Sequence, residues 1–208
     1  MTKPNGLHHL AISTGDIKRQ IEFFSDVLGM ELVALYWMHG VQGAWHGFMK
    51  LNDRASIAFV QSPQIGAIQP QPGVSHAGNA GAPSAPGTMQ HLALNVDSDA
   101  DLLTLRDRIR SRGVNVIGPI DHGFCLSIYF AGPEGLTLEI STSREAIDPR
   151  AWIDPEVVVS LELGPPAYDR EVRWRGQYGR VAFPADDGDA AEVEASVTVA
   201  AGELRPGE

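Results

Sequence analysis

The sequence has almost no cysteine and no long apolar run. Its single cysteine, Cys125, excludes an internal disulfide, and its place within an alternating segment favours a packed, unreactive thiol over a nucleophile. No stretch approaches the roughly 20 apolar residues that a helix needs to cross a bilayer. The opening residues, MTKPNGLHH, lack the apolar segment of a secretion signal. We therefore expect a cytoplasmic protein that does not enter a membrane.

The chain is also short of positive charge. It has 16 Lys and Arg residues against 26 Asp and Glu residues, which gives a formal net charge of -10. Because nucleic acids and anionic membranes attract basic proteins, this balance argues against both as partners. The 208 residues, 43% of them hydrophobic, are enough for one core or for two small modules that share one.

An internal repeat organises most of the sequence. Residues 7–33 and 89–117 both follow the pattern of a short strand, an amphipathic helix, a glycine and a further strand. Residues 43–60 and 123–140 continue the two copies as strand, turn and strand. Each copy is therefore predicted to be one βαβββ module of an α+β protein.

The modules are predicted to span residues 5–61 and 88–142. Residues 62–87, rich in Pro, Gly, Ala and Ser, are interpreted as a linker, or a loop over the site, without regular elements. Residues 143–208 form a C-terminal extension, in which only residues 157–163 favour a strand. The acidic end of this extension has the composition of a disordered tail.

Three residues of the repeat have the chemistry of metal ligands. Glu139 lies on the polar face of a predicted strand, and a buried carboxylate is costly unless it is paired or bound to a metal. His9 and His91 occupy equivalent positions on equivalent faces of the two modules. A lone histidine in a strand is more often a packed core residue, but the repeat and the matched acid favour ligands here. Two imidazoles and one carboxylate are the donor set of non-haem Fe(II) sites.

These residues resemble the vicinal oxygen chelate superfamily, which contains glyoxalases, bleomycin resistance proteins and extradiol dioxygenases. The resemblance covers about residues 5–142 and is closest to ring-cleaving extradiol dioxygenases with a single pair of modules. It implies that the modules form an open, eight-stranded, barrel-like sheet. The matching signature is Ile120-Asp121-His122, Ile128-Tyr129, Phe130-Ala131, Gly132-Pro133-Glu134-Gly135 and Glu139. Gly132 departs from the family's usual pattern, which has Asp or another small polar residue at this turn position.

The resemblance also implies roles for individual residues. His9, His91 and Glu139 would bind Fe(II), with Mn(II) as the alternative metal. His122 and Tyr129 would form hydrogen bonds to the substrate or to the oxygen intermediate.

Two further histidines compete for an acid–base role. The family has such a histidine fifteen residues before its second metal histidine, and this offset leads to His76, inside the linker. His46 is the competitor, because the repeat alignment places it opposite Ser127 on the inward face of the first module.

The implied function is that of a metal-dependent extradiol dioxygenase of aromatic catabolism, an oxidoreductase that cleaves a catechol-like ring with O2. Its partners would be a small aromatic substrate and O2, and a homo-oligomer is compatible with the resemblance. One alternative is a glyoxalase-type metal-dependent lyase or isomerase, which usually takes a fourth ligand from the first module, where the alignment places Ala58. Another is a metal-free protein that binds aromatic drugs. The sequence leaves open the ring substrate, the metal, the oligomeric state and the role of the extension.

Overall fold

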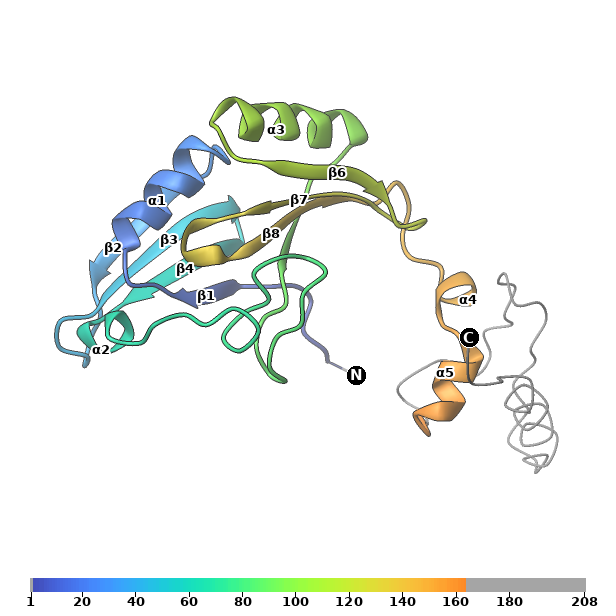
Figure 1. Cartoon of the computed structure of the whole chain (residues 1–208), viewed down its shortest axis with the longest axis horizontal. Helices are drawn as coiled ribbons and strands as arrows, with labels where there is room; N and C mark the ends of the chain where they lie inside the picture. Colours follow the sequence, from blue (N-terminus) through green and yellow to red (C-terminus); the bar gives the residue numbers. More distant parts are fainter. Residues whose placement is uncertain (1, 164–208) are drawn as a thin grey trace, which may run out of the picture. The chain divides into compact units, whose positions relative to one another are not determined.

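The structure of the protein is a computed structural model in which residues 2–163 are described. The chain divides into two compact units, Met1–Arg144 and Glu145–Glu208. Both predicted modules lie in the first unit. Figure 1 shows their helices and strands.

The first module is a four-stranded mixed sheet with one helix. In the sheet, the strand order is β1-β4-β3-β2. The β1 strand is parallel to β4, and the other neighbours are antiparallel. The elements are β1 (His9–Ser13), α1 (Ile17–Asp26), β2 (Glu31–Trp37), β3 (Trp45–Asn52) and β4 (Ala55–Gln61).

The second module repeats this plan. Its strand order is β5-β8-β7-β6, again with the first strand parallel to the last. The predicted pair of βαβββ modules and the α+β class are confirmed. The elements are β5 (Leu92–Asn95), α3 (Asp99–Ser111), β6 (Val116–Asp121), β7 (Leu126–Ala131), the 3-10 turn η1 (Pro133–Gly135) and β8 (Thr137–Thr142).

The eight strands form two sheets. Within residues 2–163, no ladder of hydrogen bonds joins the first sheet to the second. The strands β1 and β5 are therefore edge strands, each with one hydrogen-bonded neighbour, and the eight strands do not close into a barrel. This is the open arrangement that the resemblance implies, divided into two four-stranded sheets.

Local signals fix where each helix begins and ends. The carboxylate of Asp16 accepts a hydrogen bond from Arg19 N at 3.0 Å, and Ser98 Oγ accepts one from Asp101 N at 3.1 Å. Each cap satisfies a backbone N–H that has no partner within its helix. After α1 the chain turns at Gly29, whose φ of 78° lies in the left-handed region that glycine adopts at little cost.

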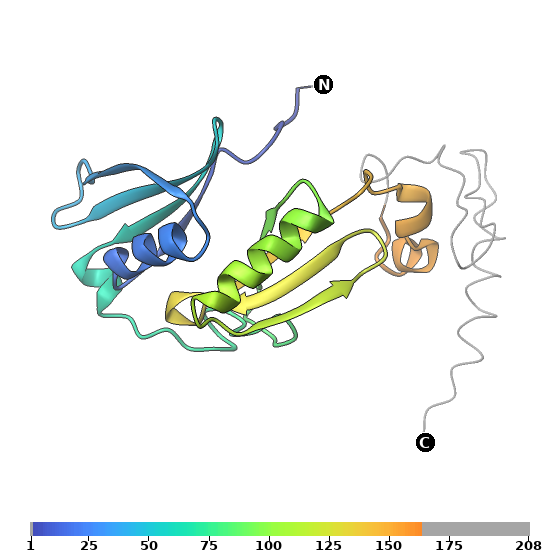
Figure 2. The same cartoon turned by 90° about the horizontal axis from the view of Figure 1, so that it is seen from above.

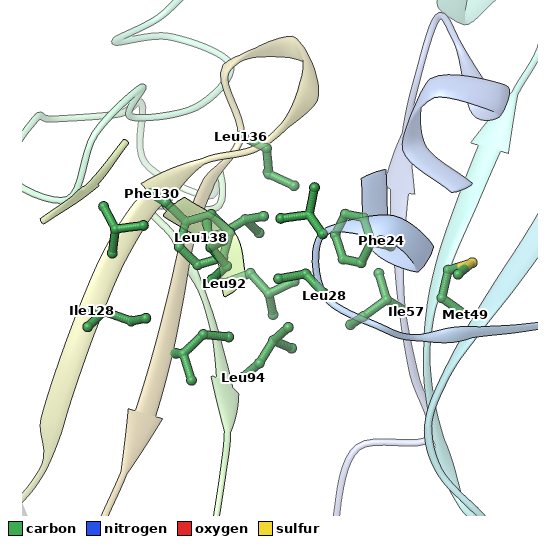
Figure 3. Packing of buried hydrophobic residues seen from close by; sticks show 14 of the residues in the cluster. Phe24, Leu28, Met49, Ile57, Leu92, Leu94, Ile128, Phe130, Leu136 and Leu138 are labelled. Carbon is green, nitrogen blue, oxygen red and sulfur yellow. The ribbon is translucent and has the colours of Figure 1, made fainter. Parts of the chain in front are cut away.

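Alternation along the strands separates an apolar face from a polar one in both sheets. The apolar faces pack on the helices, and Figure 2 shows α1 and α3 each in front of its own sheet. One cluster of buried side chains includes residues of both modules. In Figure 3, Leu28, just beyond the end of α1, lies close to Leu92 of the second module, and Phe24 of α1 lies beside Leu28. The Phe24 ring also meets that of Phe59 edge-on, with centroids 5.0 Å apart.

Two expectations about the remaining segments are wrong. Residues 62–87 contain the short helix α2 (Pro63–Gly66), because Ser62 Oγ accepts a hydrogen bond from Ile65 N and Pro63 fits a first turn. Residues 157–163 do not form a strand. The helix α5 (Pro155–Ser160) covers most of them, since the Asp154 cap and Pro155 start a helix despite the valines that follow.

The extension also contains α4 (Pro149–Trp152). Its acidic end, which is predicted to be disordered, lies outside the described residues. Among residues 2–163, no helix is both long and apolar enough to cross a membrane.

Two adjacent leucines of α3 test this account of the core. Leu102 is fully buried, whereas Leu103 is 36% exposed. Leu102→Ala should lower the free energy of unfolding by about 2–5 kcal/mol, because it removes buried methyl groups and leaves a cavity. Leu103→Ala, the matched control, should change it by less than about 1 kcal/mol. Urea denaturation measures both values, and equal losses would show that α3 does not present Leu102 to the core.

Candidate functional site

Strand register gathers polar side chains on the face of the second sheet that α3 does not cover. Glu139 of β8 stands opposite Ala93 of β5 and Tyr129 of β7. His91 directly precedes β5 and, in the same alternation, belongs to this face. We call this surface, with its residues His91, Tyr129, Glu139 and Ser141, the open face of the second module.

A direct contact on this face joins a histidine and a carboxylate. His91 Nε2 lies 2.8 Å from Glu139 Oε2. The Glu139 side chain is 6% exposed and that of His91 36%, so the pair has one buried and one accessible member. Ser141 Oγ donates a hydrogen bond to Glu139 Oε1 and lies 2.7 Å from Ser127 Oγ. The carboxylate is thereby fixed from both sides.

Tyr129 and His122 extend this group. The hydroxyl of Tyr129 is 3.0 Å from His122 Nε2, and the Tyr129 ring meets that of His91 edge-on at 6.0 Å. Burial, together with the charge and the hydrogen bond of Glu139, raises the pKa of Tyr129 to about 12. Tyr129 is therefore a neutral phenol near pH 7, able to donate its proton in a hydrogen bond.

The first sheet also has a face that its helix does not cover, with His9, Ala11 and Ser13 of β1 exposed on it. We call this surface, which also carries Phe48 and Ala58, the open face of the first module. The rings of His9 and Phe48 lie 5.6 Å apart, and His9 Nδ1 is 2.9 Å from His8 Nδ1. Within residues 2–163, no three His, Cys, Asp or Glu side chains form a group that could hold a metal. One chain thus brings His91 and Glu139 together, and His9 lies on the other sheet.

His46 is buried on the open face of the first module. Its Nδ1 lies 3.3 Å from the Tyr36 hydroxyl, and its ring is 4.4 Å from that of Phe48. Burial first, and the charge of His9 second, lower the pKa of His46, so its neutral form is favoured. Sequence reasoning missed Tyr36 and Phe48. The repeat could have identified Phe48, because Phe48 has the position in the first module that Tyr129 has in the second.

The pairing of β4 with β1 and β3 shows which residue lies where a fourth metal ligand would come from the first module. Ala58 pairs with Ala11 of β1 and with Phe48 of β3, as Glu139 pairs with Ala93 and Tyr129. Ala58 is therefore the structural equivalent of Glu139, as the alignment predicts, and it is fully buried. A methyl group stands where a carboxylate would supply a fourth ligand.

His76 lies in the linker, apart from the group around Glu139. Its Nδ1 is 2.8 Å from Ser75 Oγ, and its ring lies against Gly135 in the turn before β8. A Cβ added to Gly135 would come within 2.9 Å of His76 Nε2, so glycine makes room for the imidazole. Among the described residues, that Nε2 has no hydrogen-bond partner although it is buried.

Comparison with known proteins identifies the family. A sequence profile described as "Glyoxalase/Bleomycin resistance protein/Dioxygenase superfamily" matches residues 6–140. The chain belongs to this superfamily. The match spans both modules and confirms the resemblance to the vicinal oxygen chelate proteins.

Within the superfamily, similar proteins have different activities. An iron-dependent extradiol dioxygenase from Rhodococcus jostii (strain RHA1) is 26% identical over 174 residues, which are 77% of this chain and 51% of that protein. The chain thus spans about half the length of the dioxygenase. A lactoylglutathione lyase from Salmonella typhimurium (strain LT2) is 27% identical over 145 residues, which are 67% of this chain and 94% of the lyase.

Solved structures support the fold. The glyoxylase/bleomycin resistance protein/dioxygenase domain from Frankia sp. EAN1pec has a TM-score of 0.55 to this chain at 15% identity. The similarity covers 68% of this chain and all of the Frankia domain.

The open face of the second module brings together two side chains that could hold a metal ion. The imidazole Nε2 of His91 and a carboxylate oxygen of Glu139 converge, and these are preferred donors for Fe(II). Metal-binding histidines usually form a hydrogen bond through their other nitrogen, as His91 Nδ1 does with Gln90 Oε1. Ser141 fixes the carboxylate in the same supporting manner.

The contact between Tyr129 and Glu139 predicts a distinctive titration. In the metal-free protein, Tyr129 should ionise near pH 12, and Tyr129→Phe should remove that component from an ultraviolet titration. Glu139→Gln should lower the pKa of Tyr129, because it removes the carboxylate's charge, while burial keeps the pKa above 10.0. Between pH 10.0 and about pH 12, the Tyr129 phenol loses its proton in the unfolded chain but keeps it in the folded one. The free energy of unfolding should therefore fall as the pH rises through that window.

Glu134→Gln is the control for this titration, since Glu134 lies in η1 and pairs with the first module. It should leave the Tyr129 titration unchanged. Ionisation of Tyr129 at its ordinary pKa of 10.0 would contradict the described contact.

Proposed function

We propose that the chain is a metal-dependent extradiol-type dioxygenase that cleaves a catechol-like ring with O2. His9, His91 and Glu139 are the proposed ligands of Fe(II). The observation that carries this proposal is the contact of 2.8 Å between His91 Nε2 and Glu139 Oε2, with Ala58 at the position equivalent to Glu139. Three protein ligands leave coordination positions for a bidentate catechol and for O2.

When bound, the divalent ion would acidify the catechol hydroxyls and bring the ring next to O2. The chain's own residues would orient the substrate and manage its protons. Tyr129 would donate a hydrogen bond to a substrate oxygen, since a phenol with the ordinary tyrosine pKa of 10.0 is already protonated near pH 7. His122 Nε2, 3.0 Å from the Tyr129 hydroxyl, would orient that group and exchange a proton with it.

The aromatic side chains of the first module would hold the ring. Phe48 and Tyr36 are nearly parallel, at 11°, with centroids 6.2 Å apart, and such surfaces suit an aromatic substrate. His46, whose lowered pKa favours the neutral imidazole, is the proposed base in preference to His76. His76 instead packs on the turn at Gly135.

The third ligand is proposed to come from a second copy of the chain. His9, Ala11 and Ser13 are exposed on β1, as are Ala93 and Asn95 on β5. Both strands are sheet edges, which a partner chain readily covers. In a two-fold dimer, the first module of each copy would face the second module of the other, which gives two equal sites.

A lactoylglutathione lyase is the second candidate function. The length of the chain favours it, because the similarity covers 94% of the Salmonella lyase but only 51% of the dioxygenase. The methyl group of Ala58 disfavours it, since a glyoxalase-type site usually has a fourth protein ligand there.

Oxygen consumption separates the two candidates. Anaerobically purified protein loaded with Fe(II) should consume O2 and form ring-cleavage products with a member of a catechol panel. It should not form lactoylglutathione. His122→Ala should retain iron and lower ring cleavage by about 10²- to 10⁴-fold, the usual contribution of a positioned acid–base group. Lactoylglutathione formation without O2 uptake would favour the lyase, and neither activity in the iron-loaded protein would contradict both.

Mixing two inactive variants tests the shared site. His9→Ala and Glu139→Ala should each lose iron and activity when alone, because a site of three ligands has none to spare. After unfolding and refolding together, random pairing in a two-fold dimer should restore about a quarter of the parental sites. A mixture of His91→Ala and Glu139→Ala is the matched control and should stay inactive, because both ligands come from one module. Equal recovery in both mixtures, or recovery in neither, would contradict the shared site.

A further inference from the structure

A cavity away from the open face of the second module contains polar atoms that the proposed reaction does not use. Its volume is about 370 Å³, and it lies within the first compact unit, between β1, the linker and the turn η1. Its walls are largely apolar, with Ile65, Ile68, Met89 and Leu136 among the lining residues. Apolar walls with a few polar groups, at this volume, are typical of small-molecule sites.

Glu134 supplies the carboxylate of this cavity. Its backbone φ of 59° lies in the left-handed region, which non-glycine residues rarely adopt. In this conformation its Oε1 accepts a hydrogen bond from Gly15 N at 2.7 Å, and its Oε2 one from Gln20 Nε2 at 3.0 Å. A Cβ added to Gly15 would come within 3.2 Å of Oε1, so the glycine permits the approach. Each carboxylate oxygen retains a lone pair for a further donor.

Gln20 supplies a buried acceptor that the described residues leave unsatisfied. It lines the cavity from α1, with its side chain 1% exposed, and its Oε1 has no hydrogen-bond partner within residues 2–163. A buried acceptor without a donor is costly, so such groups in folded proteins usually have a partner. His76 Nε2, also buried and without a partner among the described residues, borders the same cavity.

The charge of the cavity selects the ligand. Glu134 is the acidic side chain in its lining, which contains no Lys or Arg. An anionic ligand would be repelled, whereas a cationic group with several N–H donors would match Glu134 and Gln20 Oε1. We propose that this cavity binds a small molecule that carries a primary ammonium group on an apolar body.

Three six-carbon probes of different charge test the proposal. n-Hexylamine, protonated near pH 7, should shift the amide resonances of Ile65, Met89 and Leu136 in ¹H–¹⁵N spectra of the intact chain. Hexanoate should not shift them, and n-hexanol should do so only at concentrations at least about tenfold higher, since it lacks the charge. No shifts with hexylamine, or equal shifts with hexanoate or hexanol, would overturn the proposal.

Two variants connect binding to the named groups. Glu134→Gln keeps the shape and removes the charge, and it should weaken hexylamine binding at least about tenfold. Gln20→Met removes the unsatisfied acceptor and should also weaken it. Gln64→Met, at an exposed residue of α2 outside the cavity lining, is the control and should bind as the parent does. Unchanged binding in Glu134→Gln would overturn the proposal even if Gln20→Met failed to fold. The O2-dependent activity is a separate measurement, so failure here leaves the proposed function standing.

Discussion

A buried carboxylate is the constraint on which the site depends. The Glu139 side chain is 6% exposed, and a charge so enclosed is stable only with partners. His91 Nε2 and Ser141 Oγ supply them, and Ser127 in turn contacts Ser141. These small hydroxyl-bearing residues are therefore not incidental polar positions on β7 and β8. They hold the acid in the one orientation that leaves its second oxygen facing an imidazole.

The two modules have the same plan but different contents. Where the second module carries Glu139 and Tyr129, the first carries Ala58 and Phe48 at the equivalent registers. One module thus concentrates proton donors and a carboxylate, and the other presents aromatic surface around His46. This division is what a site between unlike faces requires, because one face would hold the polar chemistry and the other the ring of a substrate.

Sequence reasoning predicted the modules because alternation and helix periodicity recur at equivalent positions of a repeat. The same periodicity placed Glu139 on a polar face and matched Ala58 to it, as the register confirms. It did not predict that the strands form two separate sheets. Alternation shows on which face of its strand a residue lies, but it does not show which strands pair with one another. Residues 157–163 were misassigned since valine favours strands, and the cap at Asp154 outweighed that preference.

In the proposed dimer, two residues of one chain and a third from the partner chain hold one iron. Anomalous X-ray diffraction at the iron edge, from crystals grown anaerobically with Fe(II), locates that ion and its ligands. We expect one strong peak for each chain, bounded by Nε2 of His91 and the carboxylate of Glu139 from one copy and by His9 from the other. A peak surrounded by ligands of a single chain, or bound away from Glu139, would contradict it.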